Sequence, residues 1–497
     1  MKRAITRRSF LKTGTVFGLM LTTRRPAVSA TASFPADQVR LAIVGLGGIN
    51  VPGSVGGRGR QLIALLREIP AAKITTLCDV DRTILDAEAR LLEKDGVRVT
   101  THVDFRRVLD DKTIDAVVLA TPNHWHGLGT VWACQAGKDV YVEKPFSHNI
   151  WEGRQMVAAA RKYGRMVQIG TQRRSSRILM QAFDYLRSGQ LGKIRSAHAL
   201  VFRPREGIGK VNAPTPPPAS VDYDLWCGPA PKMPIMRKQL HYDWHWVWLT
   251  GNGEVGNNGT HVIDICRWAL GQNQPPPRAI SIGERYAFND DGETPNTHIA
   301  FFDYQPAPLI CEIRNVSKGK STLGNYRKQT RGIVIECEGG YFAGDFTGGA
   351  VFDNQDRKIK DFQDGLKARD IEKAHLANFL AAIRSRKADD LNAEAAVGHV
   401  STVCSLMANV SHRIGKKTSP DAIREVIKEK PELEDAFERC STYLQENGID
   451  MTAEPAVLGP WVNYDAAKER FTGDFAELAE ELSRREYRPP FVVPKLV

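Results

Sequence analysis

One lysine stands where it could take a proton from a hydroxyl group, which is the acid–base half of an alcohol oxidation. Lys144 follows the β-prone run 139–142 and precedes Pro145, whose ring favours extended backbone at the residue before it. Burial and a neighbouring positive charge would both lower the pKa of such a lysine and let it relay protons. In isolation, Glu143 and Lys144 would more often be a surface ion pair.

A second candidate for proton transfer is His261, which lies four residues after Asn257 in a helix predicted over 256–270. Residues four apart share one helical face, so both side chains can reach one ligand. The imidazole can act as a general base, whereas the amide can only form hydrogen bonds. Asp264, one turn further on, could orient His261. The alternative is that the histidine only caps the helix.

These residues need a scaffold, and the N-terminal part of the chain predicts one. The β-type run 38–44 ends in a glycine turn that contains Gly45, Gly47 and Gly48. Such a turn between a strand and a helix lets the backbone approach a pyrophosphate. A second glycine cluster ends at Gly59, after an insertion, so the dinucleotide-binding fingerprint is split.

The next predicted strand, 73–77, leads to Asp79. An acidic residue at this position can bind the hydroxyl groups of the adenosine ribose. Because a carboxylate disfavours a 2′-phosphate, we expect NAD, although the nearby Arg82 leaves NADP possible. The alternative role of Asp79 is to cap the following helix.

A third strand, 115–120, is followed by a polar loop. Helices predicted over 129–136 and 151–163 then alternate with strands, which indicates βαβ units and a parallel sheet. His124 and His126 have no further ligand at a suitable spacing, so we expect them to line a nicotinamide pocket and expect no metal. The cofactor-binding residues predicted at this edge of the sheet are Thr121, Pro122, Asn123, His126, Glu143 and Lys144.

The glycine turn 45–48, Asp79, the run 121–126 and the Glu-Lys-Pro run 143–145 resemble the Gfo/Idh/MocA oxidoreductases over residues 38–415. The resemblance implies an N-terminal Rossmann domain that binds NAD(P). It also implies that Lys144 polarises a substrate hydroxyl and moves its proton, that Glu143 tunes Lys144, and that His261 is the general base. In the family an aspartate usually stands where this chain has Asn257.

The remainder of the chain predicts an α+β domain over 171–415 and a polar helical extension over 416–497. Strands are predicted at 279–286, 297–303, 308–315 and 332–338 without helices between them, which indicates a largely antiparallel sheet. The resemblance implies that this open sheet carries the substrate site and an oligomer interface, so we expect a homo-oligomer.

An aromatic-rich stretch precedes the Asn257–His261 pair. Aromatic rings can stack on the apolar face of a sugar while polar atoms hold its hydroxyl groups. The alternative is that the tryptophans are core residues. The predicted substrate-binding residues are Trp226, His241, Trp244, His245, Asn257 and His261.

Composition limits the classes of partner. The chain has 497 residues, enough for two domains, and a formal charge of +11 with its basic residues scattered, so we expect no nucleic-acid partner. No apolar run is long enough to span a bilayer. We expect buried free thiols, because no two of the eight cysteines have metal-ligand spacing; they lie at 78, 134, 227, 266, 311, 337, 404 and 440.

Residues 1–32 resemble a twin-arginine export signal. Arg7 and Arg8 precede the mildly apolar run 13–23, and small residues lead to Ala30. The alternative is a basic tail. We therefore expect a periplasmic or otherwise exported protein, outside the cytoplasmic pool of NAD, so its cofactor should be tightly bound and recycled on the enzyme.

The sequence supports three functions. The first is an NAD(P)-dependent oxidoreductase that acts on a CH–OH group of a sugar, cyclitol or glycoside. The second is a redox-neutral glycoside hydrolase or lyase that works through a transient keto-sugar. The third is a non-catalytic carbohydrate-binding protein on a degenerate dehydrogenase scaffold, which Asn257 supports but the retained Lys144 and His261 oppose.

Overall fold

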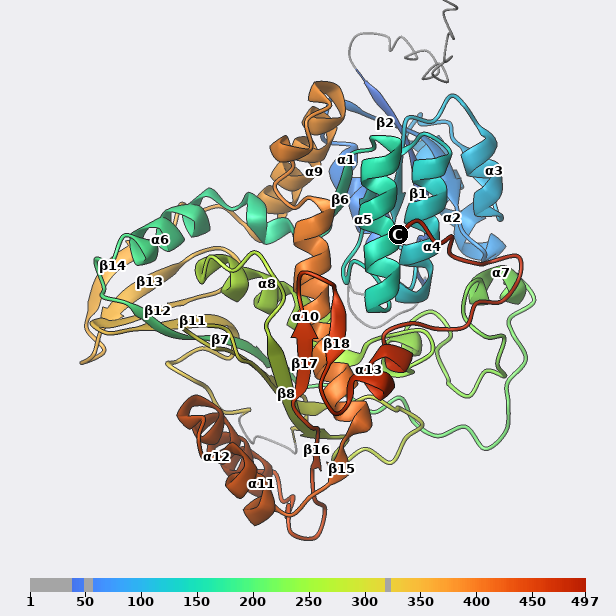
Figure 1. Cartoon of the computed structure of the whole chain (residues 1–497). Helices are drawn as coiled ribbons and strands as arrows, with labels where there is room; N and C mark the ends of the chain where they lie inside the picture. Colours follow the sequence, from blue (N-terminus) through green and yellow to red (C-terminus); the bar gives the residue numbers. More distant parts are fainter. Residues whose placement is uncertain (1–37, 49–56, 318–322) are drawn as a thin grey trace, which may run out of the picture. The chain divides into compact units, whose positions relative to one another are not determined.

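The computed structural model describes residues 38–48, 57–317 and 323–497 (Figure 1). The predicted export signal lies outside the described residues. Within them, the chain forms two β-sheets, and the predicted fold class, a Rossmann domain followed by an α+β domain, is confirmed.

The first sheet has six parallel strands in the order β3-β2-β1-β4-β5-β6, which is the Rossmann order. Its central strands are apolar and buried on both faces, as parallel strands covered by helices must be. The strands are β1 (Val39–Val44), β2 (Ala72–Cys78), β3 (Thr100–His102), β4 (Ala116–Leu119), β5 (Asp139–Val142) and β6 (Val167–Ile169).

Alternation along the strands divides the core of this sheet in two. Leu41 and Ile43 of β1 face one side, and Ala42 and Val44 face the other. The first side is covered by α1 (Arg58–Leu66), α2 (Arg82–Lys94) and, from much later in the chain, α9 (Ala368–Ser385). The second side is covered by α3 (Phe105–Asp110), α4 (Asn123–Gln135) and α5 (Ile150–Tyr163).

The polar run 121–126, predicted to be a loop, begins a helix instead. Helix α4 starts at Asn123, directly after Pro122, whose φ of −56° already suits a helix and which has no N–H to leave unpaired. The helix therefore presents the free N–H groups of its first turn to the carboxyl edge of the sheet.

The second sheet runs in the order β14-β13-β12-β11-β7-β10-β9-β8-β16-β15, with β17 also paired to β8 and β18 to β17. Its pairs are antiparallel except β7 with β10. The strands are β7 (Ile194–Phe202), β8 (Arg278–Glu284), β9 (Thr297–Phe302), β10 (Leu309–Arg314), β11 (Arg331–Cys337), β12 (Gly340–Gly344), β13 (Gly349–Asp353), β14 (Lys358–Phe362), β15 (Lys416–Lys417), β16 (Val457–Leu458), β17 (Val462–Asp465) and β18 (Arg470–Thr472).

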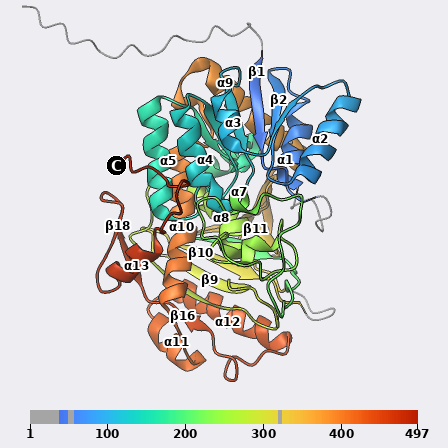
Figure 2. The ribbon, with the colours of Figure 1, turned by 90° about the vertical axis from the view of Figure 1, so that its right-hand side faces the viewer.

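Helices α6 (Arg177–Arg187), α8 (Thr260–Ala269) and α10 (Ala395–Ile414) cover the inner face of the second sheet. The outer face at β8, β9 and β10 is covered by α11 (Pro420–Ile427) and α12 (Pro431–Glu446), which lie beneath the sheet in Figures 1 and 2. This part of the sheet, where an oligomer interface was expected, is therefore occupied by the chain itself.

The extension 416–497 was predicted to be helical, and the structure differs. Besides α11, α12 and α13 (Ala476–Leu482), it contributes strands to the second sheet. Strands of two to four residues are too short to show a period of two in the sequence, so pairing with β8 decides their conformation.

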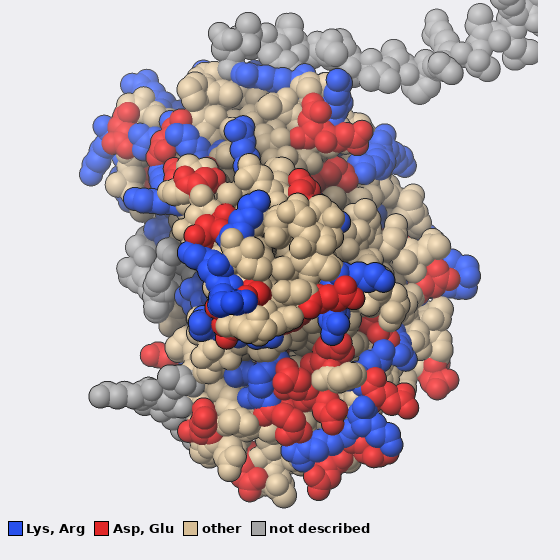
Figure 3. All heavy atoms as spheres, turned by 90° about the vertical axis from the view of Figure 1, so that its left-hand side faces the viewer, with Lys and Arg blue, Asp and Glu red and all other residues tan. Residues whose placement is uncertain are grey.

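The described residues bear on three of the expectations drawn from composition. All eight cysteines are buried and free. No helix in the described ranges has the length and apolar content needed to cross a bilayer. On the face shown in Figure 3, basic and acidic side chains lie intermixed and form no single-sign stripe.

An ion pair attaches α12 to the outer face of the sheet. Arg439 donates from both terminal nitrogens to Glu312 of β10, with N–O distances of 2.9–3.0 Å. Burial alone would raise the pKa of Glu312, but the neighbouring His198 and the charges of Arg439 and Arg314 lower it. Glu312 therefore stays ionised inside the protein.

Replacing Arg439 by methionine should lower the free energy of unfolding by about 2 kcal/mol, because a buried carboxylate loses charged hydrogen bonds. Chemical denaturation of the variant would measure this. Arg424 of α11 is the matched control: its pair with Glu438 is exposed, so Arg424→Met should cost less than about 1 kcal/mol. Equal losses in the two variants would contradict a special role for Arg439.

Candidate active site

A cavity of about 260 Å³ lies along the carboxyl edge of the first sheet. Its lining combines residues of both domains, and most of the predicted site residues contribute to it. The predicted residues in the lining are Gly45, Gly47, Asp79, Thr121, Pro122, Asn123, Glu143, Lys144, Trp226, His241, Trp244, His245, Asn257 and His261.

The glycine turn forms one wall of the cavity. Gly45 has a φ of +85°, and a Cβ there would lie 2.8 Å from the backbone of Ala120. A Cβ on Gly59 would lie 1.9 Å from the carbonyl oxygen of Gly45, so only glycine lets α1 pack this closely on the turn. Gly48 and Gly59 were predicted to bind cofactor, but neither lines the cavity; Gly59 shapes the turn from behind.

Asp79 fixes the turn to the end of β2. One carboxylate oxygen accepts a hydrogen bond from the Leu46 amide at 2.6 Å and the other from the Asp81 amide at 2.9 Å. Burial raises the pKa of Asp79, and the two backbone hydrogen bonds oppose that shift. Helix α2 is capped by Asp81, which accepts from Thr83, so the capping role considered for Asp79 is wrong.

The lysine of the opening motif reaches from the first domain to the second. Its Nζ donates to Asn257 Oδ1 at 2.7 Å and to the Asn257 carbonyl oxygen at 3.0 Å. Burial lowers the pKa of Lys144 to about 8, although the charges of Glu143 and Glu254 raise it. Lys144 can therefore gain and lose a proton near neutral pH.

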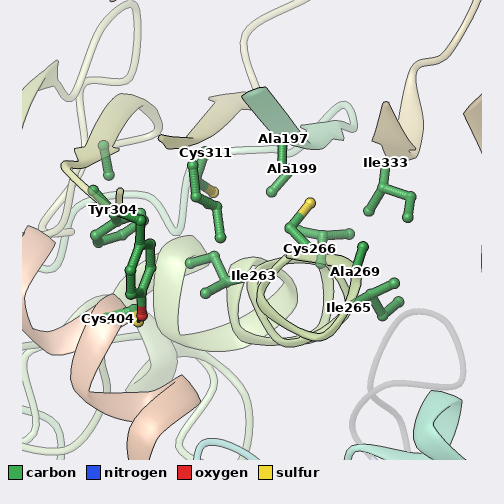
Figure 4. Packing of buried hydrophobic residues seen from close by; sticks show 14 of the residues in the cluster. Ala197, Ala199, Ile263, Ile265, Cys266, Ala269, Tyr304, Cys311, Ile333 and Cys404 are labelled. Carbon is green, nitrogen blue, oxygen red and sulfur yellow. Dashed lines mark hydrogen bonds between the residues drawn. The ribbon is translucent and has the colours of Figure 1, made fainter. Parts of the chain in front are cut away.

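Asn257 lies in a single π-helical turn, Val255–Gly259, that continues into α8. The predicted uninterrupted helix over 256–270 is thus divided, and π-turns of this kind are frequent at functional sites. Figure 4 shows how α8 is packed: Ile263 and Cys266 face the sheet near Ala197, Ala199 and Cys311, where two alanines allow close approach.

His261 follows the π-turn and stays uncharged. Burial, and then the positive charges of Lys144, Arg173 and Arg58, hold the pKa of His261 well below its usual value. Its Nδ1 has no hydrogen-bond partner among the described residues. The expectation that Asp264 orients His261 is wrong, because that buried carboxylate accepts from Arg174 and Ser401 instead.

The rings of His124 and His126 do not line the cavity, which differs from their predicted place in a nicotinamide pocket. Both lie buried on α4, because the helix starts earlier than predicted. His126 contacts the carbonyl oxygens of Pro145 and Thr121 at 2.7 and 2.9 Å, and His124 contacts that of Trp226 at 2.9 Å. These contacts fix the backbone at Thr121, Pro145 and Trp226 beside the cavity.

Residues 215–250, here called the cover segment, cross from the second domain over the edge of the first. The Arg82 amide donates to Ser220, the Asp222 amide to Val80, and Trp125 Nε1 to Leu225, at 2.9–3.0 Å. Near the end of the chain, Arg488 bonds Asp224 at 2.8 Å. The cover segment thus closes one side of the cavity.

The predicted sugar-binding residues of the cover segment lie at different parts of the cavity. Trp226 packs with Val80 at the end of β2, and His241 contacts Asp81 at 2.9 Å, so these two lie at the Asp79 end. Both residues line the cavity that also contains Lys144, but their contacts are with the end of β2 and the start of α2. His245 lies nearer to Lys144, and its ring stacks on Trp244 with centroids 3.6 Å apart.

Two charged residues of the site were not predicted. Arg58 lines the cavity and bonds Glu143 at 2.7 Å and Glu372 at 2.9 Å. Glu254 lies directly behind Asn257. The glycine cluster 56–59 drew attention to the turn but not to Arg58, and nothing in the spacing of Glu254 marked it, because its partners come from other segments.

Family models match both domains. Residues 39–171 match the NAD-binding Rossmann fold of the Gfo/Idh/MocA oxidoreductase family, and residues 206–309 match the C-terminal alpha/beta domain of that family. The scyllo-inositol 2-dehydrogenase (NAD(+)) of Bacillus subtilis is 29% identical over 156 residues, which is 31% of this chain and 42% of that protein. The inositol 2-dehydrogenase of Salmonella typhimurium is 26% identical over 155 residues, 31% of this chain and 44% of that protein.

The matched part thus spans less than half the length of these relatives. Among solved structures, the aldose-aldose oxidoreductase of Caulobacter crescentus, crystallised with glycerol, superposes with a TM-score of 0.52 at 17% identity. The superposition covers 75% of this chain and 97% of that one, and it supports the fold. Both domains thus match models of one family, the Gfo/Idh/MocA NAD-binding oxidoreductases, in the order in which they follow along the chain.

Proposed function

We propose that this protein is an NAD-dependent oxidoreductase that acts on a CH–OH group of a sugar or cyclitol. The observation that carries the proposal is the position of Lys144, bonded to Asn257 in the same cavity as the glycine turn and Asp79. A proton-transfer group and a dinucleotide cradle therefore share one space.

The residues present fit a dinucleotide. Gly45 and Gly47, both at positive φ, leave the turn open to a pyrophosphate, and Asp79 offers a carboxylate to ribose hydroxyls. When bound, NAD would accept a hydride from the substrate carbon. Neutral Lys144 would take the hydroxyl proton, and neutral His261 would hold the same hydroxyl by a hydrogen bond. With a pKa near 8, Lys144 suits a general base better than His261 does.

The substrate class rests on the relatives and on the polar residues around Lys144. The relatives named above are inositol dehydrogenases, and the similar structure is an aldose-aldose oxidoreductase. Asn257, His261 and His245 offer hydrogen-bonding groups in the same cavity, which suits a polyhydroxylated ring. The retained Lys144 and His261 favour this activity over a non-catalytic sugar-binding protein.

We further propose that the cofactor stays bound and is recycled on the enzyme, and that the twin-arginine-like N-terminus directs the protein out of the cytoplasm. The cover segment supports the first point, because its hydrogen bonds to Val80, α2 and α4 close the cavity at the Asp79 end. An enzyme that carries out a net oxidation and must reset its own NAD needs a second, oxidised substrate to reduce.

Lys144→Ala should slow single-turnover oxidation by about 10²- to 10⁴-fold, because a general base is lost. In the wild type, this rate should rise with pH through about 8, since Lys144 must be neutral to take the proton. Lys144→Arg should not restore the rate, because a guanidinium does not deprotonate. Stopped-flow absorbance near 340 nm would follow reduced nicotinamide, and near wild-type rates in both variants would rule out this mechanism.

Asp79→Ala should weaken NAD binding by about 10- to 100-fold, because a charged hydrogen-bond acceptor for ribose is removed, and should reduce discrimination against NADP. Titration of both cofactors into cofactor-free protein would test this. Discrimination equal to that of the wild type would show that another residue recognises the ribose.

The purified full chain should retain bound nicotinamide nucleotide, which denaturation would release into the supernatant for assay. Arg488→Ala should lower the retained amount, because Arg488 holds the cover segment through Asp224 and Gly228. Arg484, an exposed arginine of the same C-terminal stretch, is the control and should have no effect when replaced by alanine. A wild-type protein free of nucleotide would contradict tight binding.

A further inference from the structure

Behind Asn257 lies a carboxylate that the proposed chemistry has not yet used. Glu254 is 1% exposed and immediately precedes the π-turn. It accepts hydrogen bonds from Asn257 Nδ2 at 3.4 Å and from Asn258 Nδ2 at 2.5 Å. Arg205 Nη2 lies 3.0 Å from both of its oxygens.

The contact with Glu254 decides which way the Asn257 amide points. An ionised carboxylate can only accept hydrogen bonds, so the NH₂ end of the amide must face Glu254. The oxygen end must then face Lys144 Nζ, which it does at 2.7 Å. A reversed amide would place two donors together at Lys144 and two acceptors together at Glu254.

Glu254 also acts on Lys144 through its charge. Burial lowers the pKa of Lys144, Glu143 and Glu254 raise it, and Arg58 and Arg205 lower it. Asn257 itself carries no charge, although it occupies the position where the family usually has an aspartate. The negative charge near Lys144 on this side therefore comes from Glu254, which stands three positions before Asn257 in the chain.

We propose that Glu254 is a positioning residue of the active site. Its carboxylate accepts a hydrogen bond from the Asn257 amide and provides the negative charge that Asn257 itself lacks. It orients the amide that holds Lys144 and balances the charge of the lysine. This role rests on the proposed function of Lys144. The competing explanation is that Glu254 serves only as the buried partner of Arg205, which also bonds Tyr242 at 2.8 Å and packs over Trp246.

The test measures the titration of Lys144 directly. Acetic anhydride reacts with a neutral amine, so the extent of Lys144 acetylation against pH, read by mass spectrometry on the purified full chain, gives its titration midpoint. In Glu254→Gln this midpoint should fall by about one pH unit, because a nearby opposite charge is lost. The double variant Glu254→Gln with Asn257→Asp should return it to the wild-type value.

Glu293→Gln is the matched control. Glu293 is an exposed carboxylate that accepts from the Trp248 amide, so the variant removes the same charge without touching Asn257 or Lys144. Its midpoint should equal that of the wild type. The acid limb of single-turnover oxidation should move with the acetylation midpoint in every variant.

An unchanged midpoint in Glu254→Gln would overturn the proposal and leave Glu254 as the partner of Arg205 alone. If Glu254→Gln does not fold, Glu254→Asp decides the matter. It keeps the charge but withdraws the acceptor from Asn257, so the single-turnover rate should fall about tenfold, and a wild-type rate would overturn the proposal. Acetylation needs no substrate, so a shifted midpoint in a protein without dehydrogenase activity would refute the proposed function and not this inference.

Discussion

The hydrogen bond between Lys144 and Asn257 is the contact on which the site depends, because it joins the two domains at the point of proposed chemistry. Lys144 is fixed by its place at the end of a fully buried strand, and Asn257 by the π-turn that continues into α8. Neither domain alone contains both groups. The geometry of proton transfer is therefore set by how the Rossmann sheet and the second sheet pack together.

Two pairs of a carboxylate and an arginine lie on opposite sides of Lys144. Glu143, in contact with Arg58, lies on the side of the first domain, and Glu254, in contact with Arg205, lies on the other. Each carboxylate thus has its own arginine, so neither forms a direct ion pair with Lys144. The lysine experiences weakened attraction from both sides and strong desolvation, which explains a pKa near 8 in a cavity that contains acidic residues.

The sequence predicted what local patterns control. Alternating strands and helices and the glycine turn predicted the first domain, and motif positions predicted Asp79, Lys144, Asn257 and His261. Contacts between distant segments could not be predicted: the bond of Asp264 to Arg174, the burial of His126 against Pro145, and the placement of Trp226 beside β2 all depend on packing. The short strands of the extension, which form only by pairing with β8, were missed for the same reason.

The order of the second sheet has a consequence for how the protein behaves at high concentration. Its ten-strand path ends in β14 on one side and in β15 on the other. Strand β14 carries the exposed Lys358 and Lys360, and β15 consists of Lys416 and Lys417. Charged side chains on both border strands, including Asp361 beside Lys358, must stay in contact with water, so they disfavour pairing with a second copy, where unpaired backbone groups would otherwise invite another strand. The sheet can thus remain open within one molecule without serving as a template for aggregation.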